Sequence, residues 1–212
     1  MKRNIIVALD GMSKIKALKI AKSLKGLVWG FKVNDLLFED HKIIRSLKKF
    51  GNVFADAKLY DIPNTVANSV SRLSLLGADM ITVHASGGIE MMKAAKKIAG
   101  KSKIIAVTVL TSQADNVKNS VFKLARDAQV SGLDGIVCSA RELKYLYNIK
   151  LIKIIPGIRP IWYKSQDDQR RTTTPEGALK AGADLLVIGR PVTKSKNPVQ
   201  VIGKIWADMK EI

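Results

Sequence analysis

The stretch Asp56-Ala-Lys-Leu-Tyr-Asp-Ile-Pro-Asn-Thr65 follows an apolar run, places two carboxylates and a lysine within six residues, and breaks at Pro63. Asp56 and Lys58 are two positions apart, so in a β-strand their side chains point to the same face. A charge at the end of a buried strand needs a partner or a chemical purpose, because burying it alone is costly. The stretch therefore predicts a strand that ends in a functional site.

Similar short runs recur along the chain and alternate with amphipathic segments. The expected strands are rich in Ile and Val, as parallel strands covered on both faces are; they are 4–9, 28–33, 52–58, 79–84, 103–109, 134–138, 150–155 and 184–188. Eight strands alternating with eight helices predict an α/β protein with a (β/α)8 (TIM) barrel. An open doubly wound sheet is the alternative, but a single glycine, Gly11, follows the first strand where that fold has a glycine-rich loop.

The segments between the strands carry helix signals. In the last one, apolar residues recur with helical spacing at Ile202, Ile205, Trp206 and Met209. Asn197-Pro198 and Thr174-Pro175 each supply a cap and a first-turn proline. A faint repeat, Gly-x-Asp, stands between a helix end and a strand at Gly77-Ala-Asp79, Gly132-Leu-Asp134 and Gly182-Ala-Asp184. No linker or low-complexity segment interrupts the pattern, so we expect one domain, 1–212.

The chain has 212 residues and a formal net charge of +18, and its basic residues are spread along its whole length. The charge suggests a nucleic-acid partner, but a basic tail, an arginine-rich block and interleaved aromatic and basic residues are lacking. We expect instead a lysine-rich solvated surface and no nucleic-acid partner. A positive field of this kind also attracts a small anionic substrate.

The composition and the spacing of particular residues also exclude several classes of protein and of site. The apolar runs are too short for a membrane span, and the first one is too short for a signal peptide. The single cysteine, Cys138, excludes an internal disulfide and a cysteine-based zinc site. His41 and His84 are far apart and lack ligand partners at useful spacing. We expect a cytoplasmic protein with no membrane partner and no metal.

Polar residues accumulate where the expected strands end, and in a barrel these ends form the face that carries the chemistry; they are Asp10, Lys32, Asp56, Lys58, Asp61, His84, Thr108, Thr111, Ser112, Arg159 and Arg190. Lys32 can join Asp56 and Lys58 in an alternating set of charges. Three simpler interpretations stay open: Asp10 caps the first helix (although Ser13 is better placed), His84 is a core histidine, and Asp61 is a turn residue before Pro63.

Gly189-Arg190 precedes a proline and the final helix, which suits an oxyanion at the last strands of a barrel. Arginine offers a fork to phosphate, and glycine lets backbone amides approach. A simple turn with a surface arginine is the alternative. The loop 160–174 is long and polar and is a candidate lid.

The chain also resembles a known family, orotidine 5′-monophosphate decarboxylase in its bacterial-type branch. The matching motifs run along nearly the whole chain: Val7-Ala-Leu-Asp10, Phe31-Lys-Val33, Asp56-Ala-Lys-Leu-Tyr-Asp-Ile-Pro-Asn-Thr65, Val83-His-Ala-Ser-Gly-Gly88, Val107-Thr-Val-Leu-Thr-Ser112, Gly135-Ile-Val-Cys-Ser139, Pro156-Gly-Ile-Arg159, Asp168-Gln-Arg170 and Val187-Ile-Gly-Arg-Pro-Val192. The resemblance implies a homodimeric barrel that needs no cofactor and converts orotidine 5′-monophosphate to uridine 5′-monophosphate, the last step of de novo pyrimidine synthesis.

The resemblance also implies a role for each matching position. Lys58 matches the proton donor to the ring carbanion, Asp56 the carboxylate set against the substrate carboxylate, and Lys32 the lysine between Asp56 and the ribose. Asp61 and Thr65, with Ile62 between them, match residues lent to the neighbouring subunit's site. The remaining substrate-binding positions are the ribose ligand Asp10, the pyrimidine contacts Thr111 and Ser112, the loop positions Pro156 and Arg159, and the phosphate contacts Gln169, Gly189 and Arg190.

The chain departs from the family pattern at two places. Asn34 stands where a glycine often follows the Phe/Leu-Lys-Val motif, and the segment after Ser112 is short for the bacterial-type branch.

Rival functions remain. One rival is a magnesium-dependent decarboxylase or aldolase of the same suprafamily, which acts on sugar phosphates such as 3-keto-L-gulonate 6-phosphate. Others are a nucleic-acid-binding or structural protein, suggested by the charge, and a barrel that only binds a nucleotide.

Overall fold

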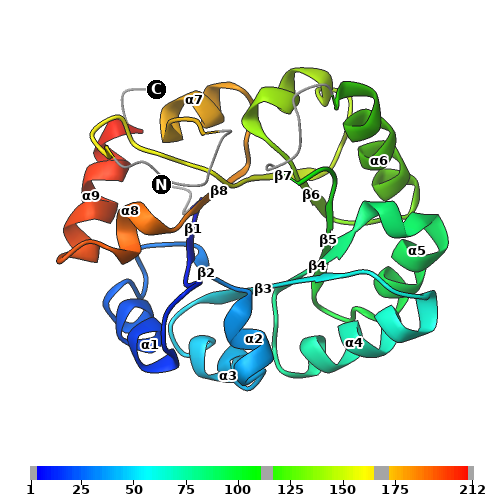
Figure 1. Ribbon diagram of the computed structural model, residues 1–212, viewed down its shortest axis with the longest axis horizontal. Coiled ribbons are helices and arrows are strands. Elements are labelled where there is room, and N and C mark those ends of the chain that lie inside the picture. Colours follow the sequence, from blue (N-terminus) through cyan, green and yellow to red (C-terminus); the bar gives the residue numbers. More distant parts are fainter. Residues whose placement is uncertain (1–3, 111–116, 165–171, 210–212) are drawn as a thin grey trace.

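The computed structural model describes residues 4–110, 117–164 and 172–209. Within them, eight parallel strands close into a barrel in chain order, with β8 pairing back to β1. Figure 1 looks down this ring and shows the helices outside it. The strands are β1 Ile5–Ala8, β2 Gly30–Val33, β3 Asn52–Leu59, β4 Met80–His84, β5 Lys103–Val107, β6 Gly135–Val137, β7 Ile152–Ile155 and β8 Leu185–Ile188. The predicted (β/α)8 barrel is confirmed. Seven observed strands lie within the expected ranges, and β3 runs one residue beyond its expected range, to Leu59.

The helices are less regular than a strict alternation with the strands. They are α1 Lys14–Ser23, α2 Asp35–Glu39, α3 Ile43–Leu47, α4 Pro63–Leu75, α5 Gly88–Ile98, α6 Lys118–Val130, α7 Pro175–Lys180, α8 Arg190–Thr193 and α9 Pro198–Asp208, with 3-10 helices η1 Ala85–Gly87 and η2 Ala140–Tyr145. Two short helices follow β2, and only η2 follows β6. The predicted caps are present, since Thr174 accepts the Gly177 N–H and Asn197 accepts the Gln200 N–H.

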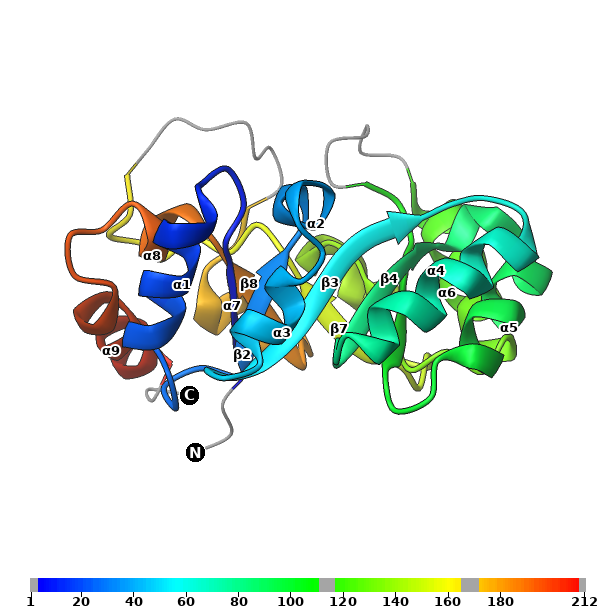
Figure 2. The same ribbon diagram turned by 90° about the horizontal axis from the view of Figure 1, so that it is seen from below.

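The barrel interior is built in two levels, because alternate residues of each strand point inward. Ile6, Phe54, Met80, Ile105, Ile154, Leu185 and Val187 form a separate apolar cluster of buried residues there. One inward position further along β3 and β4 the residues are polar, with Asp56 above Phe54 and Thr82 above Met80, and both are buried. Figure 2 shows β3 from the side, rising to the carboxyl-terminal strand ends, here named the upper rim.

The repeated Gly-x-Asp motif closes the opposite edge of the barrel, the lower rim, where the strands begin. Each aspartate directly precedes a strand, and its side chain accepts the N–H of the second residue of the preceding strand: Asp79 from Val53 at 2.7 Å, Asp134 from Ile104 at 2.8 Å and Asp184 from Lys153 at 2.8 Å. Lys48 and Lys96 add ion pairs to Asp79 and Asp134 at 2.8 and 2.6 Å. The repeat is thus a device that ties neighbouring strands together.

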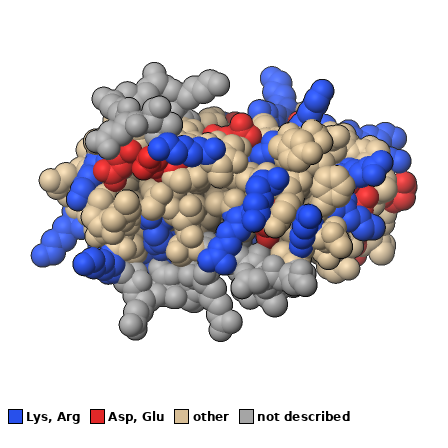
Figure 3. Space-filling model, turned by 90° about the horizontal axis from the view of Figure 1, so that it is seen from above, with Lys and Arg blue, Asp and Glu red and all other residues tan. Residues whose placement is uncertain are grey.

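Lysine and arginine side chains are scattered over the face in Figure 3, with few acidic ones among them. One local group of basic residues was not expected from the sequence. Lys118 and Lys144 both lie over the Tyr145 ring, at 4.9 and 5.0 Å from its centre.

Among the described residues, no helix combines the length and apolarity that a membrane crossing requires.

Candidate active site

A cavity of about 540 Å³ opens among the strand ends of the upper rim. This size is in the range of small-molecule sites. Its described lining includes two carboxylates, two lysines and two arginines: Asp10, Lys32, Asp56, Lys58, Arg159 and Arg190. The cavity therefore carries an excess of positive charge, which suits an anionic ligand. Two further predicted site residues, Pro156 and Gly189, also line it.

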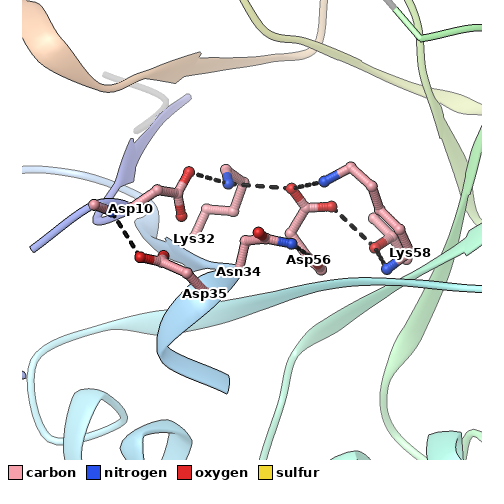
Figure 4. Close-up of polar contacts among 8 residues, drawn as sticks. Asp10, Lys32, Asn34, Asp35, Asp56 and Lys58 are labelled. Atoms are coloured by element: carbon pink, nitrogen blue, oxygen red, sulfur yellow. Dashed lines mark hydrogen bonds and ion pairs between the residues drawn. The ribbon is translucent and has the colours of Figure 1, made fainter. Parts of the chain in front are cut away.

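Asp56 stands at the centre of a chain of alternating charges (Figure 4). Its Oδ2 lies 2.6 Å from Lys58 Nζ and 3.1 Å from Lys32 Nζ. Lys32 Nζ also donates to Asp10 Oδ2 at 2.5 Å. The order Asp10, Lys32, Asp56, Lys58 thus alternates negative and positive across three neighbouring strands, and the pattern expected for Lys32, Asp56 and Lys58 is present and extends to Asp10.

Burial and pairing act in opposite directions on the two innermost charges. Burial alone would lower the pKa of Lys32, but Asp56 and Asp10 outweigh it and hold that pKa above its usual value. Burial alone would raise the pKa of Asp56, yet Lys32 and Lys58 hold it below its usual value. Both groups therefore stay charged at neutral pH. Lys32 and Asp56 are only 8% and 7% exposed, so the charge of each offsets the cost of burying the charge of the other.

The structure excludes the helix-cap interpretation of Asp10, which lines the cavity. Ser13 caps α1, since its hydroxyl accepts the Lys16 N–H, and Asp10 pairs with Lys32 instead. The turn that carries Asp10 is held by α2, because Asp35 Oδ2 at the start of that helix accepts the Gly11 N–H at 2.9 Å.

The end of β3 is irregular where it carries Asp56 and Lys58. Ala55 pairs with Ile81 but the next pairing joins Leu59 to Val83, so β3 bulges between them. Lys58 has a φ of 46°, the single positive value among the described non-glycine residues. Such a backbone costs about 1–3 kcal/mol and persists only where its surroundings hold it. The two side chains meet at this bulge and both line the cavity, as their spacing of two predicts, whereas Ala57 and Leu59 lie outside it.

Two polar side chains that sequence reasoning did not assign to the site brace the bulge. The Thr82 hydroxyl accepts the Lys58 N–H at 2.7 Å and donates to Asp56 Oδ1 at 3.0 Å. Asn34 donates from Nδ2 to the backbone carbonyl of Asp56 at 2.7 Å. The available signals were a threonine at an inward position of the neighbouring strand, and the departure from glycine at Asn34. Asn34 thus has a structural use next to the charge chain.

Several predicted residues lie elsewhere. Asp61, Ile62 and Thr65 are exposed at the start of α4 and are not among the described lining residues of the cavity. Asp61 Oδ1 accepts the N–H of Ile62 at 2.7 Å. Thr111, Ser112 and Gln169 lie outside the described residues, as does the middle of the predicted lid 160–174.

The two ends of the loop 160–174 are joined to each other at the upper rim. Ile158 and Thr173 form a parallel bridge, and the Arg159 N–H donates to the Thr173 carbonyl at 2.8 Å. Arg159 is thereby held at the cavity, which Gly189 and Arg190 at the end of β8 also line. Two arginines and a glycine at this edge form a suitable place for an oxyanion such as phosphate.

The remaining candidates are peripheral to this chemistry. His84 ends β4 at the edge of the Tyr60 ring, and burial, followed by the charge of Lys58, lowers its pKa. Cys138 is fully buried just after β6, and burial raises its pKa, so it is an unreactive thiol. Among the described residues, no three His, Cys, Asp or Glu side chains are grouped so as to hold a metal.

Comparisons with known proteins agree with this geometry. The model of a family described as "Orotidine 5'-phosphate decarboxylase / HUMPS family" matches residues 3–205. A protein named orotidine 5′-phosphate decarboxylase from Streptococcus agalactiae serotype Ia is 48% identical over 189 residues, covering 82% of this chain and 79% of its own. One of the same name from Dichelobacter nodosus is 41% identical over 225 residues, covering 97% and 98%. The crystal structure of orotidine 5′-phosphate decarboxylase from Lactobacillus acidophilus has a TM-score of 0.83 at 34% identity, covering 98% and 99%.

Proposed function

The chain belongs to the orotidine 5′-phosphate decarboxylase / HUMPS family, and we propose that it is the enzyme that converts orotidine 5′-monophosphate to uridine 5′-monophosphate. The product is made in pyrimidine biosynthesis. The observation that carries the proposal is the chain of four alternating charges in a cavity that also presents two arginines.

Lys58 is the proposed proton donor. When the carboxylate leaves as carbon dioxide, the electron pair of the broken C–C bond stays on the ring carbon. That pair lies in an orbital that cannot spread into the ring, so an adjacent cation stabilises it best. The Lys58 ammonium then transfers a proton to the same carbon, which forms the new C–H bond. Its side chain is 34% exposed, against 10% for those of Asp56 and Lys32, so it is the member of the three most open to the cavity.

Asp56 and the residues beside it supply the field in which this step occurs. A carboxylate beside the departing carboxylate disfavours the charged ground state, and this repulsion ends when carbon dioxide forms. Lys32 holds Asp56 in place, at 3.1 Å, and also contacts Asp10, the proposed ribose ligand. Because both charges of the Lys32–Asp56 pair are buried and paired, the field is organised before substrate binds.

Phosphate binding is the proposed role of the opposite edge of the cavity. Arg190, Gly189 and Gln169 are the expected contacts, with Arg159 at the base of the loop 160–174. The phosphate lies away from the bond that breaks, so its binding energy can be used to organise the site. Closure of that loop over the bound nucleotide is part of the proposal.

A homodimer with shared sites is also proposed. Asp61, Ile62 and Thr65 are exposed on this chain and follow directly on the strand that carries Asp56 and Lys58. Residues so placed can reach a neighbouring subunit's cavity, as the family resemblance implies. Sedimentation of the purified chain as a monomer at assay concentration would argue against this arrangement.

The decisive experiment is an absorbance assay for loss of orotidine 5′-monophosphate in metal-free buffer with a chelator. We expect turnover that the chelator does not reduce. Turnover that requires added magnesium, or turnover of a sugar phosphate alone, would favour the rival activity of the same suprafamily. Salt-sensitive RNA retention without turnover would favour a nucleic-acid function.

A further inference from the structure

The feature that carries a further inference is the contact between Thr82 and both ends of the β3 bulge. Thr82 lies on β4, pointing inward, and is completely buried. The bulge places residues 56–58 opposite this one residue, between the pairs Ala55–Ile81 and Leu59–Val83. The ordinary strand pairing is thus interrupted at the point where the two central charges of the site stand.

The Thr82 hydroxyl replaces part of that lost pairing. It accepts the backbone N–H of Lys58 at 2.7 Å and donates its single proton to Asp56 Oδ1 at 3.0 Å. The other carboxylate oxygen of Asp56 receives the two lysine amino groups. One hydroxyl therefore fixes the carboxylate on one side and the left-handed backbone of Lys58 on the other.

We infer that Thr82 is a positioning residue that sets Asp56 and Lys58 relative to each other for the decarboxylation. The inference rests on the proposed function. It holds that the hydroxyl, and not the shape of the side chain, matters, because only a group that accepts and donates at once can hold both ends of the bulge. Without it, the Lys58 backbone loses a partner and the Lys58 ammonium loses its fixed approach to the ring carbon.

The test is a pair of variants that separate the hydroxyl from the shape. Thr82→Val keeps the branched shape and removes the hydroxyl, whereas Thr82→Ser keeps the hydroxyl. We expect kcat of the valine variant to fall about 10- to 100-fold, as when a residue that orients a reacting group is lost. We expect its KM to change less than about threefold, since phosphate binding lies elsewhere, and Thr82→Ser to keep about a third of kcat or more.

A pH profile adds a readout that a purely structural role would not move. The hydroxyl donates to the charged form of Asp56, so its removal raises the pKa of that carboxyl. The acid limb of the kcat profile should therefore shift to higher pH in Thr82→Val but not in Thr82→Ser. If the valine variant does not fold, Thr82→Ala takes its place, with melting temperature and binding of uridine 5′-monophosphate measured first.

The outcomes separate this inference from the proposed function. A wild-type chain without turnover would contradict the proposed function itself. An active wild type with a Thr82→Val variant within twofold of it in kcat would overturn the positioning role. Equal losses in the serine and valine variants, with an unshifted acid limb, would also overturn it and leave Thr82 a packing residue.

Discussion

The upper and lower rims of the barrel both join aspartates to lysines, yet the carboxylates are held differently. At the lower rim, Asp79 and Asp134 each bind a backbone amide of the neighbouring strand as well as a lysine. At the upper rim, the partners of Asp56 are the side chains of Lys32, Lys58 and Thr82. A carboxylate bound to an amide is a fixed part of the sheet. Asp56, bound to side chains, instead lines the cavity, where its charge can act on a bound ligand.

The difference matches a division of labour in barrels, in which the carboxyl-terminal face carries chemistry and the opposite face carries stability. The same two residue types therefore should give opposite results when they are removed. Loss at the upper rim should affect turnover more than folding, and loss at the lower rim should affect folding more than turnover.

The largest expected effect is that of Lys58→Ala. Removal of the proposed proton donor and its charge should lower kcat by at least about 10⁴-fold. Nucleotide binding, measured by titration with uridine 5′-monophosphate, should stay measurable, and the melting temperature should change little. Normal turnover in this variant would end the assignment of Lys58 and with it the contrast between the rims.

Arg190→Ala should have the next largest effect. A charge-assisted bond to phosphate contributes about 1.5–3 kcal/mol, which corresponds to a KM increase of about 10- to 160-fold. Steady-state kinetics with the wild type in parallel would measure it. An unchanged KM would remove Arg190 from the phosphate site, although it would not touch the role of Lys58.

Asp79→Ala tests the lower rim. It leaves the Val53 N–H without its carboxylate partner, so we expect a loss of about 1–3 kcal/mol in the free energy of unfolding, read from urea denaturation. The kcat should stay near that of the wild type. Lys48→Gln is the matched control, because it removes only the exposed ion pair to Asp79 and should cost less than about 1 kcal/mol. A large fall in kcat of Asp79→Ala would break the contrast.

The smallest effect concerns acid. The folded-state pKa of Asp56 lies below its value in an unfolded chain, so its stabilisation is complete above the ordinary aspartate pKa and is lost as the pH falls through the folded value. The difference in unfolding free energy between wild type and Asp56→Asn should therefore shrink below about pH 4. Urea denaturation at pH 7, 4 and 3 would measure this. A difference that stays constant would show that Asp56 is not held by its lysines.

The sequence predicts the strands well because their Ile and Val runs are local signals. It predicts Lys32, Asp56 and Lys58 in one place because the strand ends of a barrel converge. The bulge at Lys58 and the contacts of Thr82 depend on how β3 meets β4, and a threonine within an apolar strand gives no sign of this. The Gly-x-Asp repeat is visible in the chain, but its purpose depends on which amide each aspartate reaches. Asn34 marks an unusual position, and only the fold reveals its contact with Asp56.

The lower-rim contacts have a consequence for how the chain folds. Asp79, Asp134 and Asp184 each join the start of one strand to the start of the next, over separations of 26, 30 and 31 residues. Contacts of this range close without a large loss of chain entropy. Each pair of strands with its connecting segment can therefore become ordered as a unit. The pairing of β1 with β8 joins the two ends of the barrel and has the highest entropic cost, so it is the step that we expect to limit the rate of folding.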